Sequence, residues 1–498
     1  MGQKKKLSSD QRTKFYRQYQ SNCNPINTCI LWCVRTVMSS QLLRSLILWR
    51  CGASGKILDR ILMPVFNKKL SARIARYHTQ SDLRKAASAS ATKLAEPRRA
   101  AGAMVQAYQP SRNDQTEHNL IVEFGDDQRL EFPLVWLRDN CQCTKCFHPK
   151  SNSRIIDWEL FDVEATQFPQ STTLSEDGTK LAITWNDGHR SEFTSEWLME
   201  RNFTEENCQQ YSEDWYRPRP RLWSKQQFEQ VLNHFQYEDV INCNATLLEW
   251  VEALIHHGVV MIHDAPLAEM ECRRLAERVG FIRKTHYGEE YMIKAKEGTS
   301  NVAYLSAPLQ MHTDLPYYDY LPGCNLLHCL VQSESQGGRN LLCDAFYVAE
   351  RMRQEFPVEF KALSETLVNW SDLGEDEGWQ FHSIYRAPVI CIGRDGNVER
   401  INHSIPQRDS FFNVPLSNVE GWYRALTQFV RLIHREAVRF KTAPGDILAF
   451  SNVRMLHGRS GYTDTVANTR HVVGAFLDWD EIYSRWRVLK GMVPKNGL

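Results

Sequence analysis

The sequence predicts a mainly β fold of the barrel or jelly-roll type with flanking helices. Short strand-like runs recur in the second half of the chain, at 258–262, 326–331, 341–346, 387–391, 398–402 and 447–450. Helical periodicity is confined to fewer segments, at 246–256, 267–279, 349–356 and 419–439. Many short strands combined with few helices are typical of barrels and jelly rolls. A chain of 498 residues also leaves room for a second, smaller domain.

The first fifth of the chain is basic, whereas the rest is acidic. The chain holds 60 Lys and Arg and 59 Asp and Glu, of which residues 1–100 hold 20 and 4, a net charge of +16 against −15 for the remainder. Nucleic-acid binding needs clustered Lys and Arg on the folded body. The acidic body therefore argues against a nucleic-acid partner.

The extension 1–110 has the composition of a targeting segment. Its apolar patches at 29–49 are interrupted by Arg35 and Arg44, so we expect no stable membrane span. An Arg-rich, acid-poor, amphipathic segment is typical of a mitochondrial transit peptide. The alternatives are a basic extension without a targeting role, or a cytoplasmic product if translation starts at an internal Met such as Met104.

A small β-rich domain is expected at 118–205. Strand-like runs at 120–124 and 130–136 flank Gly125–Asp127, and runs at 180–185 and 189–193 flank Asn186–Gly188. Gly- and Asp-containing turns between such runs predict β-hairpins.

Three closely spaced cysteines in this domain predict a structural zinc site. Cys141, Cys143 and Cys146 supply three thiolates, and a closed tetrahedral site needs four N or S ligands. His148 and His189 compete for the fourth position. His189 is favoured, because it begins the second hairpin and would join it to the cysteines. Reduced structural thiols are the alternative, and the scattered remaining cysteines argue against disulfides.

After a charged, Pro-containing linker at 206–225, the domain 226–495 carries the metal-binding pattern. His312 and Asp314 are two residues apart, so on a strand both side chains point to one face. His457 follows a late strand that a barrel can bring beside them. Two imidazoles and one carboxylate form the facial triad that suits Fe(II) and leaves coordination positions open.

Residues 118–495 resemble the γ-butyrobetaine dioxygenase and trimethyllysine dioxygenase family of carnitine biosynthesis. The resemblance is carried by the residues at 312–314, 327–329, 337–338, 456–459 and 470. It implies a double-stranded β-helix core, Fe(II), 2-oxoglutarate as co-substrate, O2, and ascorbate in the reaction. It also implies His189 as a zinc ligand and a homodimer. Arg470 would anchor the distal carboxylate of 2-oxoglutarate through its forked guanidinium, and Asn340 would lie near the same co-substrate.

The resemblance further implies a substrate site for a trimethylammonium group, which aromatic faces attract. The aromatic positions that match the family's cage are Tyr287, Tyr291, Tyr304 and Phe476. Asn301 and Ser404 match positions that bind the substrate carboxylate. Tyr291 stands where Trp is usual, Phe476 where Tyr is usual, and Ser404 replaces an Asn. Leu315 replaces an aromatic residue directly after Asp314.

The sequence therefore predicts hydroxylation of a trimethylammonium carboxylate, with γ-butyrobetaine converted to L-carnitine as the preferred reaction. Trimethyllysine hydroxylation is the alternative within the class. A non-catalytic, cupin-like binding protein is the alternative of another class. The presence of His312, Asp314, His457 and Arg470 together argues against that last interpretation, because a binding shell has no need of all four.

Overall fold

A computed structural model describes residues 105–113, 117–125, 128–294, 305–376, 378–465 and 468–491. The predicted targeting segment lies outside these ranges up to residue 104, and so do Asn301 and Tyr304. Among the helices of the described residues, none combines the length and apolar character needed to cross a membrane.

The small domain contains both predicted hairpins. Two three-stranded antiparallel sheets form it, with strand orders β1-β2-β3 and β6-β7-β8. Their bounds are β1 Val105–Asn113, β2 Glu117–Phe124, β3 Arg129–Pro133, β6 Ser171–Leu174, β7 Lys180–Thr184 and β8 Arg190–Thr194. Alternate residues of the two sheets are buried in one core, among them Val122, Phe124 and Ile183.

One helix of this domain stands where the sequence predicted the end of a strand. Residues 134–136, expected as strand, begin the helix α5, because Pro133 lacks a backbone N–H for the ladder and suits a helix start. The other elements are α5 Leu134–Asp139, β4 Phe147–His148, β5 Ser153–Arg154, a 3₁₀ turn Glu164–Thr166 and α6 Ser195–Glu200.

The segment 206–225, expected as a linker, is partly helical. The helix α7 spans Glu205–Tyr211 and continues into a π-helical turn, Ser212–Tyr216. The hydroxyl of Thr204 accepts a hydrogen bond from the backbone N–H of Asn207 and caps the start of α7. Trp223 is buried, and its indole N–H donates to the backbone oxygen of His257 at 2.8 Å, so the core of the second domain already includes this residue.

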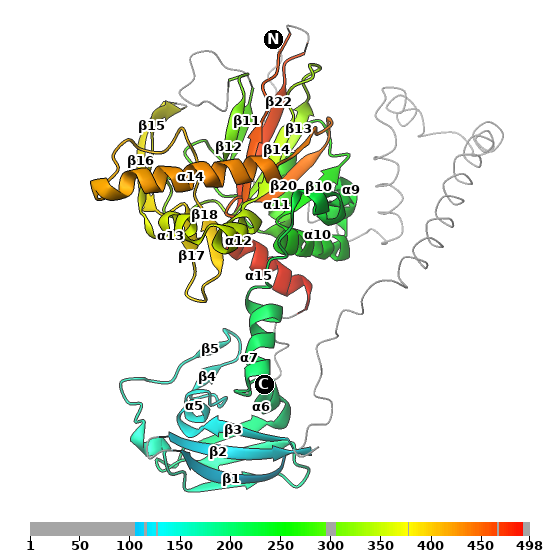
Figure 1. The fold of residues 1–498 in the computed structure, drawn as a ribbon. Coiled ribbons are helices and arrows are strands. Elements are labelled where there is room, and N and C mark those ends of the chain that lie inside the picture. The colour runs from blue at the N-terminus through cyan, green and yellow to red at the C-terminus, as the bar shows by residue number, and fades with distance from the viewer. Residues whose placement is uncertain are drawn as a thin grey trace, which may run out of the picture. The chain divides into compact units, whose positions relative to one another are not determined.

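The second domain is built on two β-sheets (Figure 1). The six-stranded sheet has the order β11-β22-β13-β20-β10-β9, and the four-stranded sheet has the order β12-β21-β14-β19. The first comprises β9 Asn233–Gln236, β10 Val259–His263, β11 Glu290–Ile293, β13 Cys324–Val331, β20 Ile447–Ser451 and β22 His471–Leu477. The second comprises β12 Leu309–His312, β14 Asn340–Asp344, β19 Val438–Phe440 and β21 Met455–Arg459. This confirms the double-stranded β-helix with flanking helices.

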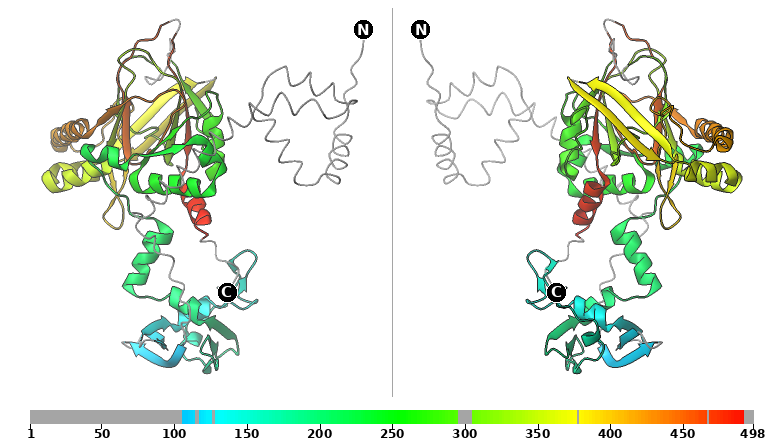
Figure 2. Two further views of the ribbon diagram at one scale, coloured as in Figure 1. Left: turned by 90° about the vertical axis from the view of Figure 1, so that its right-hand side faces the viewer. Right: turned by 90° about the vertical axis from the view of Figure 1, so that its left-hand side faces the viewer.

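Helices cover both sheets on their outer sides (Figure 2). On the four-stranded sheet these are α12 Ala345–Glu355 and α14 Leu416–Glu436, against which α13 Pro357–Glu365 packs. On the six-stranded sheet they are α9 Tyr237–Asn242, α10 Asn244–His257 and α11 Glu271–Val279, and α15 Trp479–Leu489 packs against α10 and α11. The helix predicted at 419–439 ends earlier, because Val438 pairs with Leu342 as a strand.

The remaining elements are two hairpins and two short turns. Their bounds are β15 Val368–Asp376, β16 Trp379–Ala387, β17 Ile390–Ile392, β18 Val398–Ile401, a 3₁₀ turn Lys225–Gln227 and α8 Phe228–Val231. The candidate site lies between the two sheets, and residues of both line it.

Candidate active site

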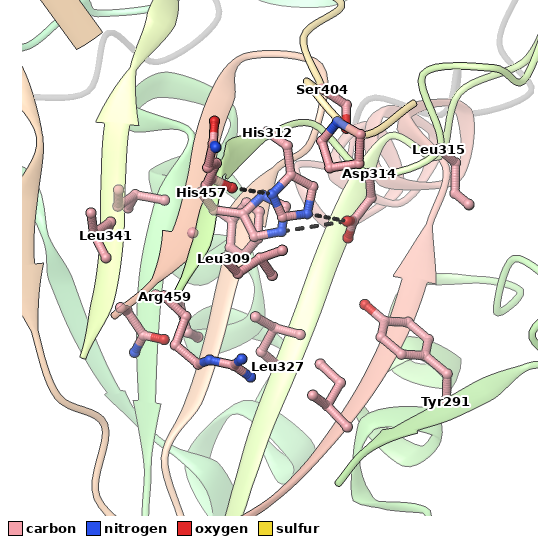
Figure 3. Close-up of a pocket in the computed structure, with 18 of the residues that line it drawn as sticks. Tyr291, Leu309, His312, Asp314, Leu315, Leu327, Leu341, Ser404, His457 and Arg459 are labelled. Carbon is pink, nitrogen blue, oxygen red and sulfur yellow. Dashed lines mark hydrogen bonds and ion pairs between the residues drawn. The ribbon is translucent and has the colours of Figure 1, made fainter. Parts of the chain in front are cut away.

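The two histidines of the predicted triad lie opposite each other on neighbouring antiparallel strands. His312 ends β12 and His457 lies in the middle of β21, where the two residues are register partners. Their ring centroids are 4.4 Å apart. The Nε2 atoms of His312 and His457 lie 3.1 and 3.5 Å from Oδ1 of Asp314, as Figure 3 shows. The structure thus brings together the three side chains that the sequence suggested as metal ligands.

Asp314 is held in place through its backbone as well as its side chain. Its N–H donates to Oδ1 of Asn452 at 2.8 Å, and Nδ2 of Asn452 donates back to the Asp314 carbonyl at 3.0 Å. Its Oδ2 accepts a hydrogen bond from Nδ2 of Asn325 at 2.5 Å. Thr313 faces the other way, and the backbone N–H of His403 donates to its hydroxyl at 3.1 Å. Because Oδ2 of Asp314 is bound by Asn325, Oδ1 is the carboxylate oxygen that is directed at the two imidazoles.

The electrostatics of the three groups suit a divalent cation. Nδ1 of His312 lies 2.8 Å from the backbone oxygen of Gln310, so Nδ1 donates its proton there and Nε2 is the ring nitrogen that faces Asp314. Burial opposes ionisation of Asp314, but His457 and His312 hold the pKa of that carboxyl well below its usual range. Burial lowers the pKa of His457. An ionised carboxylate with two inward imidazole nitrogens is a donor set that fits Fe(II).

The pocket around these residues lies between the two sheets. Both sheets line it, the six-stranded one with residues such as Leu327 and Phe476, the four-stranded one with residues such as Asn340 and His457. Every predicted site residue of this domain that the structure describes lines it, namely Tyr287, Tyr291, His312, Asp314, Asn340, Ser404, His457, Arg470 and Phe476.

Arg470 brings a buried positive charge to the pocket. Its side chain is almost inaccessible, yet Nε and Nη1 have no hydrogen-bond partner among the described residues. Its guanidinium carbon lies 5.5 Å from the ring centre of Tyr462, and burial lowers the pKa of Arg470. By contrast, Nη2 of the neighbouring Arg459 donates to the backbone oxygen of Ala307 at 3.1 Å. A buried guanidinium with two unsatisfied nitrogens favours an anionic ligand, which a carboxylate would satisfy.

Aromatic rings form one wall of the pocket. Tyr291 stacks on Phe476 with ring centres 5.0 Å apart and an angle of 27° between the planes. Tyr287 also lines the pocket. Sequence reasoning missed Tyr317, a buried pocket residue that stands three positions beyond Asp314.

Two polar side chains of the pocket already make contacts within the protein. The hydroxyl of Ser404 donates to Oε1 of Gln407 at 2.5 Å, and Nδ2 of Asn340 donates weakly to the Thr442 hydroxyl at 3.4 Å. Gln407 lines the pocket and was also missed by sequence reasoning. No pattern in its neighbourhood distinguishes it from an ordinary loop residue.

Leu315 adopts an unusual backbone conformation beside the metal-binding residues. Its φ is +56° although it is not a glycine, and its side chain is buried in the pocket. This left-handed conformation costs an L-residue about 1 kcal/mol or more. Its carbonyl accepts a hydrogen bond from the N–H of Tyr318 at 2.9 Å, so the tight turn directs Asp314 inward and places an aliphatic side chain next to it.

The cysteines of the small domain form a second cluster. Nε2 of His189 lies 3.2 Å from Sγ of Cys141 and 3.5 Å from Sγ of both Cys143 and Cys146. All four ligand atoms lie within 4.8 Å of one another. Burial raises the pKa of the Cys141 thiol to about 12. The competing His148 is exposed and its Nδ1 contacts the Ser151 hydroxyl at 2.7 Å instead, so His189 is the histidine that joins the cysteines.

Comparisons with known proteins agree with these two domains. Residues 216–476 match the family model of the taurine catabolism dioxygenase TauD, TfdA family. Residues 111–199 match the model of the γ-butyrobetaine hydroxylase-like N-terminal domain.

Three characterised relatives cover most of the chain. γ-Butyrobetaine dioxygenase of Homo sapiens is 34% identical over 382 residues, which are 76% of this chain and 96% of that protein. The enzyme of the same name from Pseudomonas sp. (strain AK-1) is 30% identical over 74% of this chain and 93% of its own length. Mitochondrial trimethyllysine dioxygenase of Bos taurus is 29% identical over 75% of this chain and 86% of its own length. The chain therefore belongs to the TauD/TfdA family and is a 2-oxoglutarate-dependent dioxygenase of the γ-butyrobetaine and trimethyllysine dioxygenase group.

Proposed function

We propose that this enzyme hydroxylates a trimethylammonium carboxylate, with γ-butyrobetaine as the substrate and L-carnitine as the product. The observation that carries the proposal is the convergence of His312, Asp314, His457 and the buried Arg470 on one pocket with an aromatic wall. The names of the relatives with the highest identity support the choice of substrate.

His312, Asp314 and His457 are proposed as the ligands of Fe(II). Bound there, Fe(II) supplies the chemistry by which O2 and 2-oxoglutarate hydroxylate an unactivated C–H bond, with succinate and CO2 as co-products. Three protein ligands would leave coordination positions for the co-substrate and O2, and the pocket beside them would provide the space. Arg470 binds the distal carboxylate of 2-oxoglutarate, which gives its buried Nε and Nη1 a partner. Asn340 lies beside the same carboxylate.

The aromatic wall is proposed to bind the quaternary ammonium group. A trimethylammonium cation has no N–H to donate, so the faces of Tyr287, Tyr291 and Phe476 are suitable partners. Ser404 would contact the substrate carboxylate. Asn301 and Tyr304 are proposed for the carboxylate and the cage by resemblance alone, because both lie outside the described residues.

The test is a turnover assay on the full-length chain with Fe(II), 2-oxoglutarate and ascorbate. We expect γ-butyrobetaine to yield succinate and carnitine in equal amounts by mass spectrometry. His312→Ala should abolish both products, whereas the control His148→Ala, which changes an exposed histidine outside the pocket, should leave them unchanged. Succinate without carnitine would reject the substrate but keep the reaction class.

Trimethyllysine hydroxylation is the runner-up. The trimethyllysine dioxygenases among the relatives support it. Ser404 and Leu315 depart from the residues expected for γ-butyrobetaine. Offering both substrates in one competition assay distinguishes the two. A product formed only from trimethyllysine would assign the chain to that branch.

The remaining assignments are also proposals. Cys141, Cys143, Cys146 and His189 hold a structural zinc ion, supported by their spacing of 3.2–3.5 Å around Nε2. The domains are the extension 1–110, the zinc-binding domain 118–205, the linker 206–225 and the dioxygenase domain 226–495. We propose a mitochondrial enzyme of carnitine biosynthesis and a homodimer, to be tested by fluorescence localisation of the full chain and by light scattering.

A further inference from the structure

A hydrogen-bonded chain joins the aromatic wall to the carboxylate between the two histidines. The hydroxyl of Tyr291 donates to Oδ1 of Asn325 at 2.9 Å, and Nδ2 of Asn325 donates to Oδ2 of Asp314 at 2.5 Å. Oδ1 of Asp314 faces the Nε2 atoms of both histidines. The two oxygens of one carboxylate therefore have different partners.

The surrounding strands fix the geometry of this chain. Asn325 is fully buried in β13, where it is the register partner of Phe476 in β22. Tyr291 in β11 pairs with Gly474 in the same β22. A Cβ on Gly474 would overlap the Tyr291 ring, so only glycine lets the ring lie flat across the strand and stack on Phe476. Tyr291 is thus held in place on one side by backbone and on the other by an aromatic ring.

The Tyr291 hydroxyl and the Asp314 carboxylate together match one orientation of the Asn325 amide. An O–H donates to the amide oxygen, which leaves the NH2 group to point at Asp314. A reversed amide would place its oxygen against the carboxylate, and two acceptors in contact are unfavourable when buried.

We propose that Asn325 and Tyr291 are positioning residues that keep Asp314 a monodentate metal ligand. A carboxylate is able to bind a metal through one oxygen or both, and the second oxygen would occupy a position needed by 2-oxoglutarate. The amide donor on Oδ2 keeps that oxygen away from the metal, and hydrogen bonds of this type strongly affect metal affinity. The proposal rests on the iron site proposed above. It adds that Tyr291, a residue of the aromatic wall, helps to keep a coordination position of the metal free for 2-oxoglutarate.

The test uses the metal-free full-length protein and Mn(II) as the probe. Mn(II) affinity is measured by electron paramagnetic resonance, and 2-oxoglutarate affinity of the Mn(II)-loaded protein by calorimetry. We expect Asn325→Leu, which frees Oδ2 of Asp314, to change Mn(II) affinity and to weaken 2-oxoglutarate binding to the loaded protein about tenfold or more. Tyr291→Phe, which keeps the aromatic face, should weaken 2-oxoglutarate binding to the loaded protein about threefold or more.

Tyr237→Phe is the matched control. It removes another tyrosine hydroxyl, which donates to the Glu271 carboxylate far from the pocket, and both affinities should be unchanged. Unchanged affinities in Asn325→Leu and Tyr291→Phe would overturn the positioning role, and Tyr291→Phe decides alone if Asn325→Leu does not fold.

A further variant separates this proposal from the iron site. If His457→Ala leaves Mn(II) binding intact, the iron assignment is wrong and the positioning role is rejected with it. If His457→Ala abolishes Mn(II) binding while the two positioning variants bind normally, only the positioning role is rejected.

Discussion

The replacement Arg470→Met should weaken co-substrate binding while leaving the stability of the ligand-free protein almost intact. The Arg470 side chain is 4% exposed, and two of its nitrogens have no partner in the described part of the chain. Burying a cation whose N–H groups lack partners lowers the free energy of unfolding, and an uncharged methionine removes that penalty. The replacement removes the cation–π interaction with the Tyr462 ring at 5.5 Å, which is worth about 0.5–1 kcal/mol. The free energy of unfolding should therefore fall by less than about 1 kcal/mol, or rise.

The affinity for 2-oxoglutarate, unlike the stability, should fall strongly in Arg470→Met. Loss of one partner of a buried, hydrogen-bonded charge pair costs about 2–5 kcal/mol. At about 1.4 kcal/mol for each factor of ten, the affinity for 2-oxoglutarate should fall about thirtyfold or more. Arg470→Lys keeps the charge without the forked guanidinium, and it should recover only part of the affinity.

Arg454→Met is the matched control for stability. Arg454 is equally buried at 2%, but its Nε and Nη2 donate to the two carboxylate oxygens of Asp344 at 3.0 and 2.7 Å. Leaving that buried carboxylate without its counter-charge should cost about 3–5 kcal/mol. Urea unfolding without 2-oxoglutarate, together with calorimetric titration of 2-oxoglutarate, measures both effects. The reasoning is refuted if Arg470→Met destabilises the protein as much as Arg454→Met while 2-oxoglutarate binds normally.

Three further predictions concern other parts of the molecule. Cys143→Ser should lower the zinc content measured by mass spectrometry and the melting temperature, with iron content unchanged; full zinc occupancy would reject the zinc site. Gly474→Ala should displace the Tyr291 ring, which a Cβ would overlap, and raise the KM for the trimethylammonium substrate. The control Gly421→Ala lies in a helix with open space around the position and should stabilise the protein by up to about 1 kcal/mol. Equal KM values in both variants would contradict the predicted overlap between a Cβ added at Gly474 and the Tyr291 ring. Burial lowers the pKa of His328 from 6.5 to about 4. As the pH falls, the unfolded state therefore takes up the proton before the folded state does. The free energy of unfolding should fall between pH 6.5 and pH 4, by at most about 3 kcal/mol. His328→Leu should flatten that part of the stability curve, and an unchanged curve would show that His328 does not contribute.

The sequence by itself determined the types of site residue. The spacing of His312 and Asp314 follows from the period of a strand, in which alternate side chains share a face. The cysteine spacing and the second hairpin indicated His189, and the structure places its Nε2 within 3.5 Å of each thiol. The strand-rich pattern after residue 258 predicted the sheets, because short β-branched runs are local signals. Local signals failed at residues 134–136, where a proline ended a strand and started a helix.

Only the tertiary structure decided how the site is held. Asn452 is 138 positions from Asp314, and yet its amide makes both backbone hydrogen bonds of that residue. Asn325 and Tyr291 come from different strands and meet only because β11, β22 and β13 are adjacent in one sheet. Whether Arg470 has a partner also depends on every side chain packed around it. Hydrogen-bond partners distant in sequence leave no periodic pattern, so the residues that orient the ligands became visible only when the two sheets were in place.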